Sequence, residues 1–446
     1  MSLPQGPLYH VTTLSNFARG FDKYSRRYCK GLIPESVHPN ESYLLPATEL
    51  SFGVAKAQRL VEKLAIAGDR PLVLGAALSW SEVSENRRTG IGLVWPSPDL
   101  PVSGTFEVTA TGELGTAVSL EDTMSRSLEL HAHRFAGYSE LRPRTLSFLP
   151  VARGCQAACP FCFSESSVSA DQESGRIQLG EVQRWSDLAR LRGARRAVIT
   201  GGGEPTLLPW DQLIALVSAC SRNFPKTVLI TNGAQLASGS KPAMAARLGA
   251  LSDAGLSVLA VSRHHPSEEK NAELMRFRTL TPALLEACTE QAEHLGFTRR
   301  LICVLQRGGI ASEVDVQGYM EWAISMGVEE VCFKELYVST SRESVYFSHA
   351  ANRWSAEHQV PLSVVTGWAR RQGMKLTERL PWGAPVFSGE HRGRPMRVAA
   401  YTEPSLFWER SNGVARSWNV MSDSQCLVSL EDRHSRIGLP GKRALQ

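Results

Sequence analysis

Short apolar runs alternate with helix-like segments through the central part of the chain, and this alternation limits the possible folds more than any other feature of the sequence. Such an order predicts parallel strands joined by crossover helices. Several runs are rich in Val, Ile and Leu, as expected of strands that are covered on both faces. The six expected strands are residues 146–152, 197–200, 227–231, 257–261, 299–305 and 330–336. Together they predict an α/β protein with a partial (β/α)6 TIM-like barrel.

Segments between these runs carry helix signals. Residues 281–296 begin with Thr-Pro, contain an apolar stripe and end at a glycine. Residues 241–255 and 313–327 also finish at glycines, which suit a left-handed helix cap. Cys288 falls on the apolar stripe of the first of these helices, so we expect it in the core.

Cys155, Cys159 and Cys162 follow the first expected strand, and their offsets of four and three residues suit a cluster held by three protein thiolates. An iron–sulfur cluster usually has four thiolate ligands, so three of them leave one iron open to a non-protein ligand. A zinc site is the alternative, but structural zinc prefers four ligands and no nearby Cys or His supplies the fourth. The run therefore favours an iron–sulfur cluster.

This run resembles the signature of the radical S-adenosylmethionine (SAM) superfamily, Cys-x-x-x-Cys-x-x-Cys with an aromatic residue, here Phe161, before the last cysteine. The resemblance implies a [4Fe–4S] cluster on Cys155, Cys159 and Cys162, with SAM on the open iron and Phe161 near the adenine. It also implies a flavodoxin- or ferredoxin-like electron donor. SAM would be cleaved to methionine and a 5′-deoxyadenosyl radical, which takes a hydrogen atom from a substrate carbon.

Glycine-rich and polar segments follow the next strands, at the end where barrel enzymes build their active sites. Residues 201–205 read Gly-Gly-Gly-Glu-Pro, and glycines let a backbone approach a ligand closely. The superfamily has a Gly-Gly-Glu-Pro segment at this place that contacts SAM. By this resemblance, the expected SAM-binding residues are Gly202, Gly203, Glu204, Asn232, Ser262 and Arg263. The alternatives are a simple tight turn for the glycines and a surface position for Arg263.

Gln306 follows the fifth expected strand, and Glu335 and Tyr337 lie in or just after the sixth, where substrate groups usually arise. We take these three residues as candidate catalytic residues because a charged group inside an apolar strand calls for an explanation. The alternative is that Glu335 shares a face with Phe333 and Tyr337 and forms an ordinary salt bridge.

The regions on either side of the expected barrel differ from it in sequence pattern. Residues 1–140 are expected to form an accessory α+β domain, residues 141–345 the barrel, and residues 346–446 a C-terminal extension with a β-rich cap. The accessory domain would contain a helix at 54–66 and strands at 71–77, 90–95 and 105–109. The extension would contain a hairpin of 406–410 and 414–420 around Asn412-Gly413, followed by a strand at 426–430, over the barrel opening.

Short patches in the accessory domain resemble the His–Tyr–Glu pattern of ADP-ribosyltransferase-like folds, which bind NAD. The residues concerned are His10, Tyr43 and Glu107, each with its immediate neighbours. The resemblance covers only these patches. The alternatives are a capped N-terminal histidine, a core tyrosine and an exposed strand glutamate.

The remaining cysteines bear on the reaction. Nine cysteines are present, and the six outside the run are isolated, which argues against a disulfide framework and against an auxiliary cluster of the SPASM or twitch kind. Without a second cluster to take a substrate electron, we expect a redox-neutral elimination, epimerisation or rearrangement on a small natural-product or sugar substrate. The alternatives are a peptide- or RNA-modifying enzyme that recognises its substrate through residues 1–140, and a zinc- or cluster-stabilised binding protein.

The amino-acid composition excludes few classes of protein. The chain has 446 residues, of which 43% are hydrophobic and 21% charged, as in ordinary globular proteins. The net charge of +5 comes without a long Lys/Arg block, so nucleic acid is not indicated as a partner. No apolar run approaches the ~20 residues of a membrane span, and no signal-peptide pattern is visible. We therefore expect a cytoplasmic protein that does not bind a membrane.

Overall fold

In the computed structural model of the protein, the described residues are 7–22, 27–29, 42–46, 50–64, 69–78, 83–85, 93–95, 99–109, 111–130, 136–164, 167–171, 177–339, 344–404 and 406–439. The chain divides into two compact units, Met1–Phe135 and Ala136–Gln446. The second unit includes the segment beyond residue 345, whose strands join the barrel sheet.

The first unit is built on an antiparallel sheet with the strand order β2-β3-β8-β5-β1-β4-β7-β6 and with β9 beside β8. Its strands are β1 (Leu8–Thr13), β2 (Phe21–Asp22), β3 (Arg27–Cys29), β4 (Ser42–Pro46), β5 (Pro71–Ala76), β6 (Ser84–Glu85), β7 (Leu93–Trp95), β8 (Asp99–Val108) and β9 (Leu114–Val118). Its helices are α1 (Leu14–Gly20), α2 (Leu50–Leu64) and α3 (Leu120–Glu129). These elements confirm the predicted helix and strands, although residues 65–66 and 90–92 of those predictions lie outside the described residues.

Both faces of the central strands in this unit are covered. Leu72 and Leu74 of β5 pack in a cluster with Phe17 of α1, whereas Val73 packs in another cluster with Leu50 of α2. Successive side chains of a strand point to opposite faces, so the apolar run of β5 fills two cores. This explains why β5 reads as a continuous apolar run and not as an alternating one.

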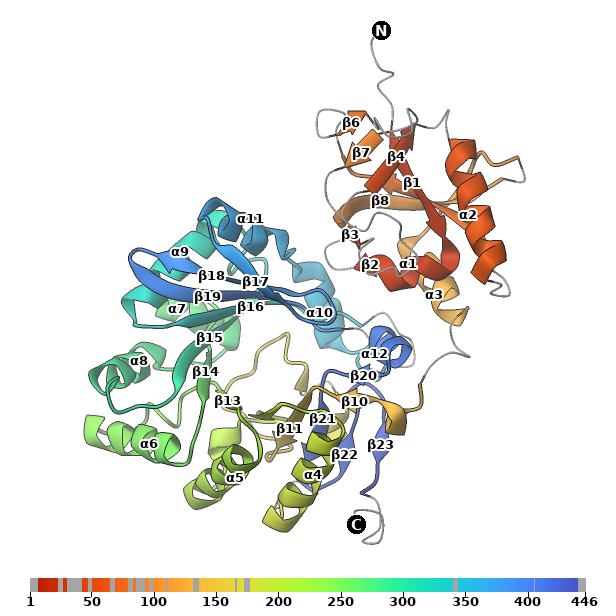
Figure 1. Ribbon diagram of the computed structural model, residues 1–446. Helices are drawn as coiled ribbons and strands as arrows, with labels where there is room; N and C mark the ends of the chain where they lie inside the picture. The colour runs from red at the N-terminus through yellow and green to blue at the C-terminus, as the bar shows by residue number, and fades with distance from the viewer. Residues whose placement is uncertain are drawn as a thin grey trace. The chain divides into compact units, whose positions relative to one another are not determined.

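The second unit contains the expected partial barrel. Six parallel strands lie side by side in chain order: β11 (Thr145–Leu149), β12 (Arg196–Ile199), β13 (Thr227–Thr231), β14 (Val258–Ser262), β15 (Thr298–Leu305) and β16 (Glu330–Glu335). The helices between them are α4 (Leu179–Leu191), α5 (Trp210–Asn223), α6 (Lys241–Asp253), α7 (Glu268–Met275), α8 (Thr281–Glu290) and α9 (Glu313–Ser325). They surround the outer face of the curved sheet (Figure 1).

The barrel strands are apolar on both faces. Leu229, Leu259 and Leu301 belong to the large core cluster shared with the helices, whereas Val228 and Ala260 belong to a smaller cluster inside the barrel. The six predicted strands are confirmed, and Cys288 is fully buried in α8 as expected. The predicted left-handed helix caps are confirmed at Gly255, where φ is +86°, and at Gly327, where φ is +71°.

The C-terminal segment is β-rich, as predicted, and it extends the barrel sheet at both ends. Strands β17 (Lys375–Arg379), β18 (Pro385–His391) and β19 (Arg394–Tyr401) follow β16, while β21 (Trp418–Met421), β22 (Cys426–Leu427) and β23 (Arg436–Ile437) follow β11, giving a 12-stranded sheet. Helices α10 (Ala350–His358) and α11 (Ser363–Arg371) precede β17. Strand β19 pairs in parallel with β16, and β21 with β11.

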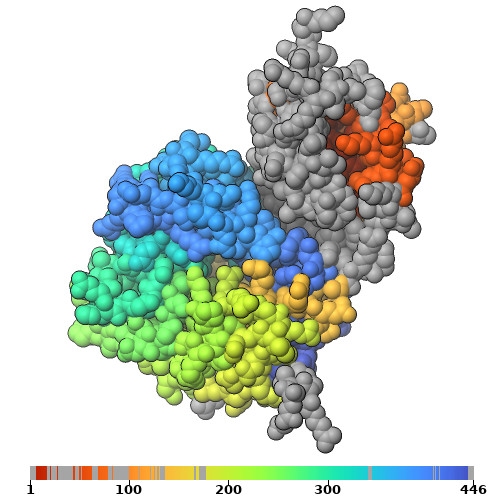
Figure 2. Space-filling model, viewed as in Figure 1, coloured from red at the N-terminus to blue at the C-terminus, as the bar shows by residue number. Residues whose placement is uncertain are grey.

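The predicted hairpin around Asn412-Gly413 was wrong. Residues 406–410 belong to a helix, α12 (Leu406–Asn412), and the following strand β20 (Val414–Ala415) pairs in parallel with β10 (Arg142–Pro143). Gly413 has φ +62°, so it ends the helix in a left-handed conformation and does not form a hairpin turn. The space-filling view shows the orange residues that begin this unit beside the blue C-terminal residues (Figure 2).

We predict that Trp418→Ala destabilises the second unit by about 3–5 kcal/mol, the usual range for removal of a buried aromatic side chain. Trp418 is 1% exposed, donates its indole N–H to the Leu141 carbonyl oxygen (3.1 Å) and packs edge-on against Trp185 of α4. Urea unfolding of the apoprotein measures the change. Leu376→Ala is a matched control on β17, because Leu376 is 46% exposed, and it should change the free energy of unfolding by much less. Equal losses in the two variants would contradict the packing described.

Candidate active site

The cysteine loop directly follows β11. Cys155 is exposed, Cys159 and Cys162 are half-buried, and all three thiols are free of disulfides. The N–H of Cys162 donates to the Cys159 carbonyl oxygen (3.0 Å), so the last two cysteines share one tight turn. Gly154 has φ +101°, a conformation that favours glycine, and it turns the chain just before the first cysteine. The loop therefore presents three accessible thiols within one short segment.

The glycine segment after β12 packs directly against the backbone of the cysteine loop. The N–H of Gly203 donates to the Val151 carbonyl oxygen (2.7 Å), and the N–H of Glu204 donates to that of Gly154 (2.8 Å). A Cβ on Gly203 would lie 2.1 Å from the Gly154 oxygen, and one on Gly202 would lie 2.5 Å from the Ala152 oxygen. The glycines are thus required for contact between the two loops. The close approach of a ligand to Gly202 and Gly203 stays a prediction.

Glu204 connects the loops that follow β12 and β13. Its buried carboxylate accepts hydrogen bonds from the Thr206 N–H (3.0 Å), the Thr206 hydroxyl (2.6 Å) and the Thr231 hydroxyl (2.5 Å). Its second oxygen accepts from the Asn232 N–H (2.8 Å). Glu204 also caps the short 3-10 helix Pro205–Leu207. The structure gives this carboxylate an organising role, and its predicted contact with SAM stays a prediction.

Asn232 carries this organisation to the first cysteine. Its side-chain N–H group lies 3.6 Å from the sulfur of Cys155 and donates to the Gln156 side-chain oxygen (3.1 Å). The Asn232 oxygen accepts from the Ala234 N–H (2.9 Å), which sets the orientation of the amide. The Asn232 amide therefore places a hydrogen-bond donor beside the Cys155 sulfur.

The other side of the cysteine loop rests on the end of α7. The carbonyl oxygen of Met275 accepts a hydrogen bond from the Ala158 N–H (3.0 Å) and lies 3.8 Å from the Cys159 sulfur. Sequence reasoning did not find Met275, because a backbone carbonyl leaves no signal in the residue type. The cysteine loop is therefore held between the glycine segment and the C-terminus of α7.

Aromatic side chains form a wall beside the cysteines. The Phe161 ring lies 5.1 Å from the His264 ring and 5.7 Å from that of Trp354 in α10, measured between centroids. The Phe163 ring lies 5.4 Å from Tyr337 and 5.1 Å from Tyr346. Trp354 and Tyr346 come from a segment far along the chain from the cysteines, so no local pattern pointed to them.

The Tyr337 hydroxyl donates to the buried carboxylate of Glu431, which also accepts from the Ser339 hydroxyl (2.6 Å). Tyr337 therefore links the aromatic wall to the C-terminal segment. Its predicted catalytic role stays a prediction.

His264 is the histidine of the site. Its backbone N–H donates to the Asn271 side chain (2.8 Å), and its ring Nδ1 accepts from the Val304 N–H (3.1 Å). The neutral ring therefore carries its proton on Nε2. Burial, and secondarily the nearby Arg263 charge, lower the pKa of His264 to about 3, so the ring is neutral at physiological pH.

Arg263 is buried and bonded within its own loop. Its guanidinium donates to the carbonyl oxygens of His265 (2.6 Å) and Pro266 (2.7 Å), forms an ion pair with Glu268 and lies 5.2 Å from the Trp322 ring of α9. These contacts fix the guanidinium between its own loop and α9. Its predicted contact with SAM stays a prediction, whereas the alternative of a surface position is wrong, because Arg263 is fully buried.

The remaining predicted residues lie at the C-terminal ends of neighbouring strands. Ser262 ends β14 and is half-buried, and Glu335 ends β16 and is 2% exposed. Gln306 follows β15 immediately, and the last residue of β15 is paired in register with Glu335. Gln306 is fully buried, and its amide oxygen has no hydrogen-bond partner among the described residues. The strand order thus brings Gln306 and Glu335 to one end of the barrel.

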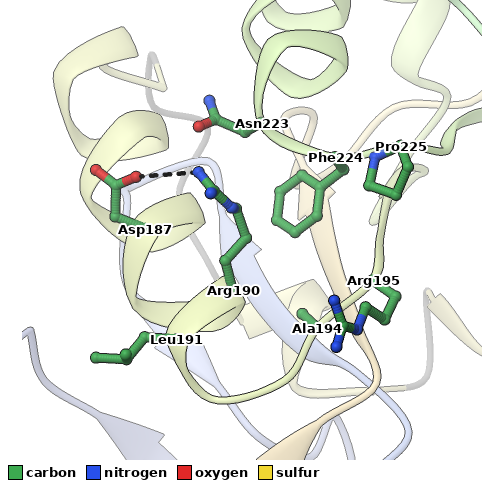
Figure 3. A pocket seen from close by; sticks show the side chains of 8 residues that line it. All are labelled: Asp187, Arg190, Leu191, Ala194, Arg195, Asn223, Phe224 and Pro225. Atoms are coloured by element: carbon green, nitrogen blue, oxygen red, sulfur yellow. Dashed lines mark ion pairs between the residues drawn. The ribbon is translucent and has the colours of Figure 1, made fainter.

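A surface cavity of about 390 Å³ lies elsewhere, lined by Asp187, Arg190, Leu191, Ala194, Arg195, Asn223, Phe224 and Pro225 (Figure 3). These residues come from the C-terminal ends of α4 and α5 and the segments that lead into β12 and β13. The cavity is therefore at the N-terminal ends of the parallel strands, whereas the cysteine loop follows the C-terminal end of β11. We do not assign it to the active site.

The NAD-like patches of the first unit fall on β1, β4 and β8. His10 is buried, with its ring 5.6 Å from that of Tyr28. Glu107 forms ion pairs with Arg70 (3.4 Å) and Arg126 (3.0 Å). The side chain of Tyr43 is outside the described side chains. NAD binding by this unit stays a prediction.

Residues 149–314 match the sequence model of the Radical SAM superfamily. The match includes the cysteine loop, the glycine segment and the ends of β13, β14 and β15. Residues 149–314 therefore form a radical SAM domain. Such a domain uses a [4Fe–4S] cluster and SAM. A search of curated protein sequences finds no match.

Solved structures similar to this chain include Streptococcus suis SuiB bound to S-adenosylmethionine, at 17% identity and a TM-score of 0.44, covering 72% of this chain and 67% of that one. Another is histidine-tagged anSMEcpe with bound AdoMet, at 19% identity and a TM-score of 0.31, covering 43% and 49%. A third is a radical SAM methyltransferase from Sphaerobacter thermophilus, at 18% identity and a TM-score of 0.32, covering 48% and 62%. The chain spans about two thirds of the length of SuiB and less of the other two.

The residues of the cysteine loop fit the cluster. Cys155, Cys159 and Cys162 supply three accessible thiols, and the Asn232 side-chain N–H group lies 3.6 Å from the sulfur of the first. Nowhere in the described ranges do three Cys, His, Asp or Glu side chains converge closely enough for a single metal ion. A four-iron cluster requires a different arrangement of ligands from that of a single metal ion, because each thiolate binds its own iron. Separately, no helix in the described ranges combines the length and apolar character needed to cross a membrane.

We predict that Gly203→Ala at least halves the iron content after anaerobic reconstitution. The added Cβ would lie 2.1 Å from a backbone oxygen of the cysteine loop, so the two loops must separate. Iron analysis and the absorbance at about 400 nm measure cluster loading. Gly249→Ala in α6 is the matched control, since a Cβ there meets no atom within 4 Å, and it should load fully. Equal loading of both variants would show that the loops need not touch.

We predict that acid destabilises the protein through His264. In the unfolded state the His264 ring has a pKa near 6.5, whereas in the folded state its pKa is about 3. The contribution of His264 to stability is therefore present above pH 6.5 and is lost as the pH falls, by up to about 1.4 kcal/mol per unit. Urea unfolding of wild type and His264→Asn between pH 7.5 and 5 compares the slopes. The variant should lose less stability on acidification, and parallel curves would contradict the assignment.

Proposed function

We propose that the protein is a radical SAM enzyme with a single cluster that carries out a redox-neutral elimination, epimerisation or rearrangement on a small polar substrate such as a sugar or natural product. When bound, the cluster and SAM supply reductive cleavage of SAM and removal of a hydrogen atom from a substrate carbon. Cys155, Cys159 and Cys162 would hold the cluster, and the segments after β12, β13 and β14 would bind SAM.

The proposed substrate class rests on one observation, the buried side-chain amide of Gln306. Its oxygen has no donor among the described residues, and leaving a buried acceptor unpaired costs about 1–3 kcal/mol. A hydroxyl or amino group of a substrate is the donor that would remove this cost. Glu335, which ends the neighbouring strand, adds a second acceptor at the same end of the barrel. Two buried acceptors suit a substrate with several hydroxyl or amino groups.

The other cysteines support the redox-neutral outcome. Cys220, Cys288, Cys303, Cys332 and Cys426 lie in five different elements, namely α5, α8, β15, β16 and β22. Burial raises the pKa of each of these thiols, so they stay protonated and pack as small apolar groups. The side chain of Cys29 is outside the described side chains. Thiols dispersed in this way support a reaction that needs no second cluster to accept an electron.

The aromatic wall supplies the protein's part in the reaction. Phe161, His264 and Trp354 form one contiguous group, and Phe163, Tyr337 and Tyr346 form another. Apolar rings next to the reacting carbon keep water and stray hydrogen donors away from a reactive intermediate. The His264 ring offers a single N–H donor at a fixed position, because its other nitrogen is engaged by the Val304 backbone.

We predict that Cys159→Ala abolishes the absorbance at about 400 nm and all 5′-deoxyadenosine formation, because the cluster loses one of its three thiolates. Cys220→Ala is the matched control, since Cys220 is fully buried in α5, and it should keep both signals. Anaerobic reconstitution, spectroscopy and chromatographic detection of 5′-deoxyadenosine measure the outcome. Loss of both signals in both variants, or zinc in place of iron, would overturn the assignment to this class.

The substrate class is tested with the whole reconstituted chain and a strong chemical reductant. We expect 5′-deoxyadenosine above the uncoupled background with sugars or aminoglycosides, and products at the same oxidation level as the substrate. A response only to ribosomal peptides or to tRNA would instead favour a macromolecule-modifying enzyme. An oxidised product formed in stoichiometric yield would contradict the redox-neutral reaction.

A further inference from the structure

We propose that residues 276–280, between α7 and α8, form the docking site for an acidic protein that donates one electron to the cluster. This inference rests on the proposed function, because it requires a cluster on the cysteine loop. The donor loses one electron and the cluster gains it, with no bond formed or broken.

The segment begins at the cysteine loop itself. The carbonyl oxygen of Met275 bonds to the Ala158 N–H (3.0 Å) and lies 3.8 Å from the sulfur of Cys159. Arg276 is the next residue, so one peptide group separates it from an atom in contact with a cluster ligand. A protein bound to this segment would therefore have a short path for an electron to Cys159.

The segment presents positive charge. Arg276 and Arg278 are exposed, and neither forms an ion pair with a described residue. Nearby cations differ in this respect, because Arg263 pairs with Glu268 and Lys270 pairs with Glu273. Unpaired surface cations attract a partner of opposite charge and increase its association rate.

Apolar and basic groups continue this surface around the loop. Leu280 is 48% exposed at the end of the segment, and Leu207, on the other side of the cysteines, is 39% exposed and lies against Gly154. Arg153, which precedes Gly154, is also exposed. Exposed leucines together with exposed arginines suit a protein partner better than a small anion, because protein interfaces combine apolar and polar groups.

The backbone of the segment is strained at both ends. Arg276 has φ +51° and Leu280 has φ +54°, a left-handed conformation that costs about 1–2 kcal/mol for residues other than glycine. Glycine would serve the backbone better at either place, but it would remove an exposed side chain. Strain of this kind points toward a function for those side chains.

Hydrogen bonds with residues of α7 stabilise the strained conformation of this segment. The Asn271 side chain donates to the Thr279 hydroxyl (3.4 Å), and the Phe277 N–H donates to the Ala272 carbonyl oxygen (3.1 Å). Asn271 also accepts from the His264 N–H, which ties the segment to the loop after β14. These hydrogen bonds fix the backbone that carries Arg276, Arg278 and Leu280. Binding a partner therefore requires little reordering of the chain.

The test compares two ways of reducing the cluster in the whole reconstituted chain. An acidic flavodoxin, reduced to its hydroquinone, is the protein donor, and photoreduced 5-deazaflavin is the small donor. The double variant Arg276→Gly and Arg278→Gln removes both charges, and glycine suits the left-handed backbone at position 276. We expect the rate of bleaching at about 400 nm with flavodoxin to fall about tenfold at low salt, with a shallower dependence on ionic strength.

Two controls separate charge from folding. Arg192→Gln with Arg195→Gln removes two exposed arginines at the opposite end of the barrel and should leave both rates unchanged. Arg276→Lys with Arg278→Lys keeps the charge and should restore most of the flavodoxin rate. Reduction of the Gly/Gln variant by flavodoxin at the wild-type rate and salt dependence would overturn the docking site. Failure of every variant to form 5′-deoxyadenosine with the small donor would instead overturn the proposed function.

Discussion

The close contact between two backbones, that of the cysteine loop and that of the glycine segment after β12, is the constraint on which the rest of the site depends. Hydrogen bonds from Gly203 and Glu204 reach carbonyl oxygens at residues 151 and 154, and there is no room for a β-carbon between the two chains. Because the bonds use only backbone groups, they fix the position of the loop without using any side chain of the cysteines. The thiols remain available for a cluster.

The charged and polar residues around this contact act mainly as connectors between loops. Glu204 joins the loops after β12 and β13, Asn232 continues from there to Cys155, and Arg263 closes the loop after β14. Each lies in a loop that follows a parallel strand. Buried networks that are fully satisfied make such a region rigid. Hydrogen bonds within the protein thus organise the loops of the site.

Local patterns were enough to predict the barrel and the cysteine loop. The strands β11 to β16 are short apolar runs, and the cysteines, the glycines and Asn232 follow strand ends in the printed sequence. What the sequence does not contain is the partner of each polar side chain. The contacts of Arg263 with Trp322, of Phe161 with Trp354 and of Tyr337 with Glu431 join residues far apart in the chain. The apolar residues of the segment 406–412 fit a strand or a short helix equally well, so their pattern alone does not predict α12.

The pairing of β11 with β21 has a consequence for the order in which the protein assembles. Strand β11, which leads into the cysteine loop, has β12 on one side and residues 418–421 on the other. During synthesis the cysteines leave the ribosome long before this second neighbour exists. The first barrel strand therefore stays an open sheet edge until residues 418–421 have been made, and closing it late imposes a large entropy of loop closure. The strand that leads into the cysteine loop therefore gains its second neighbour only after nearly the whole chain has been made.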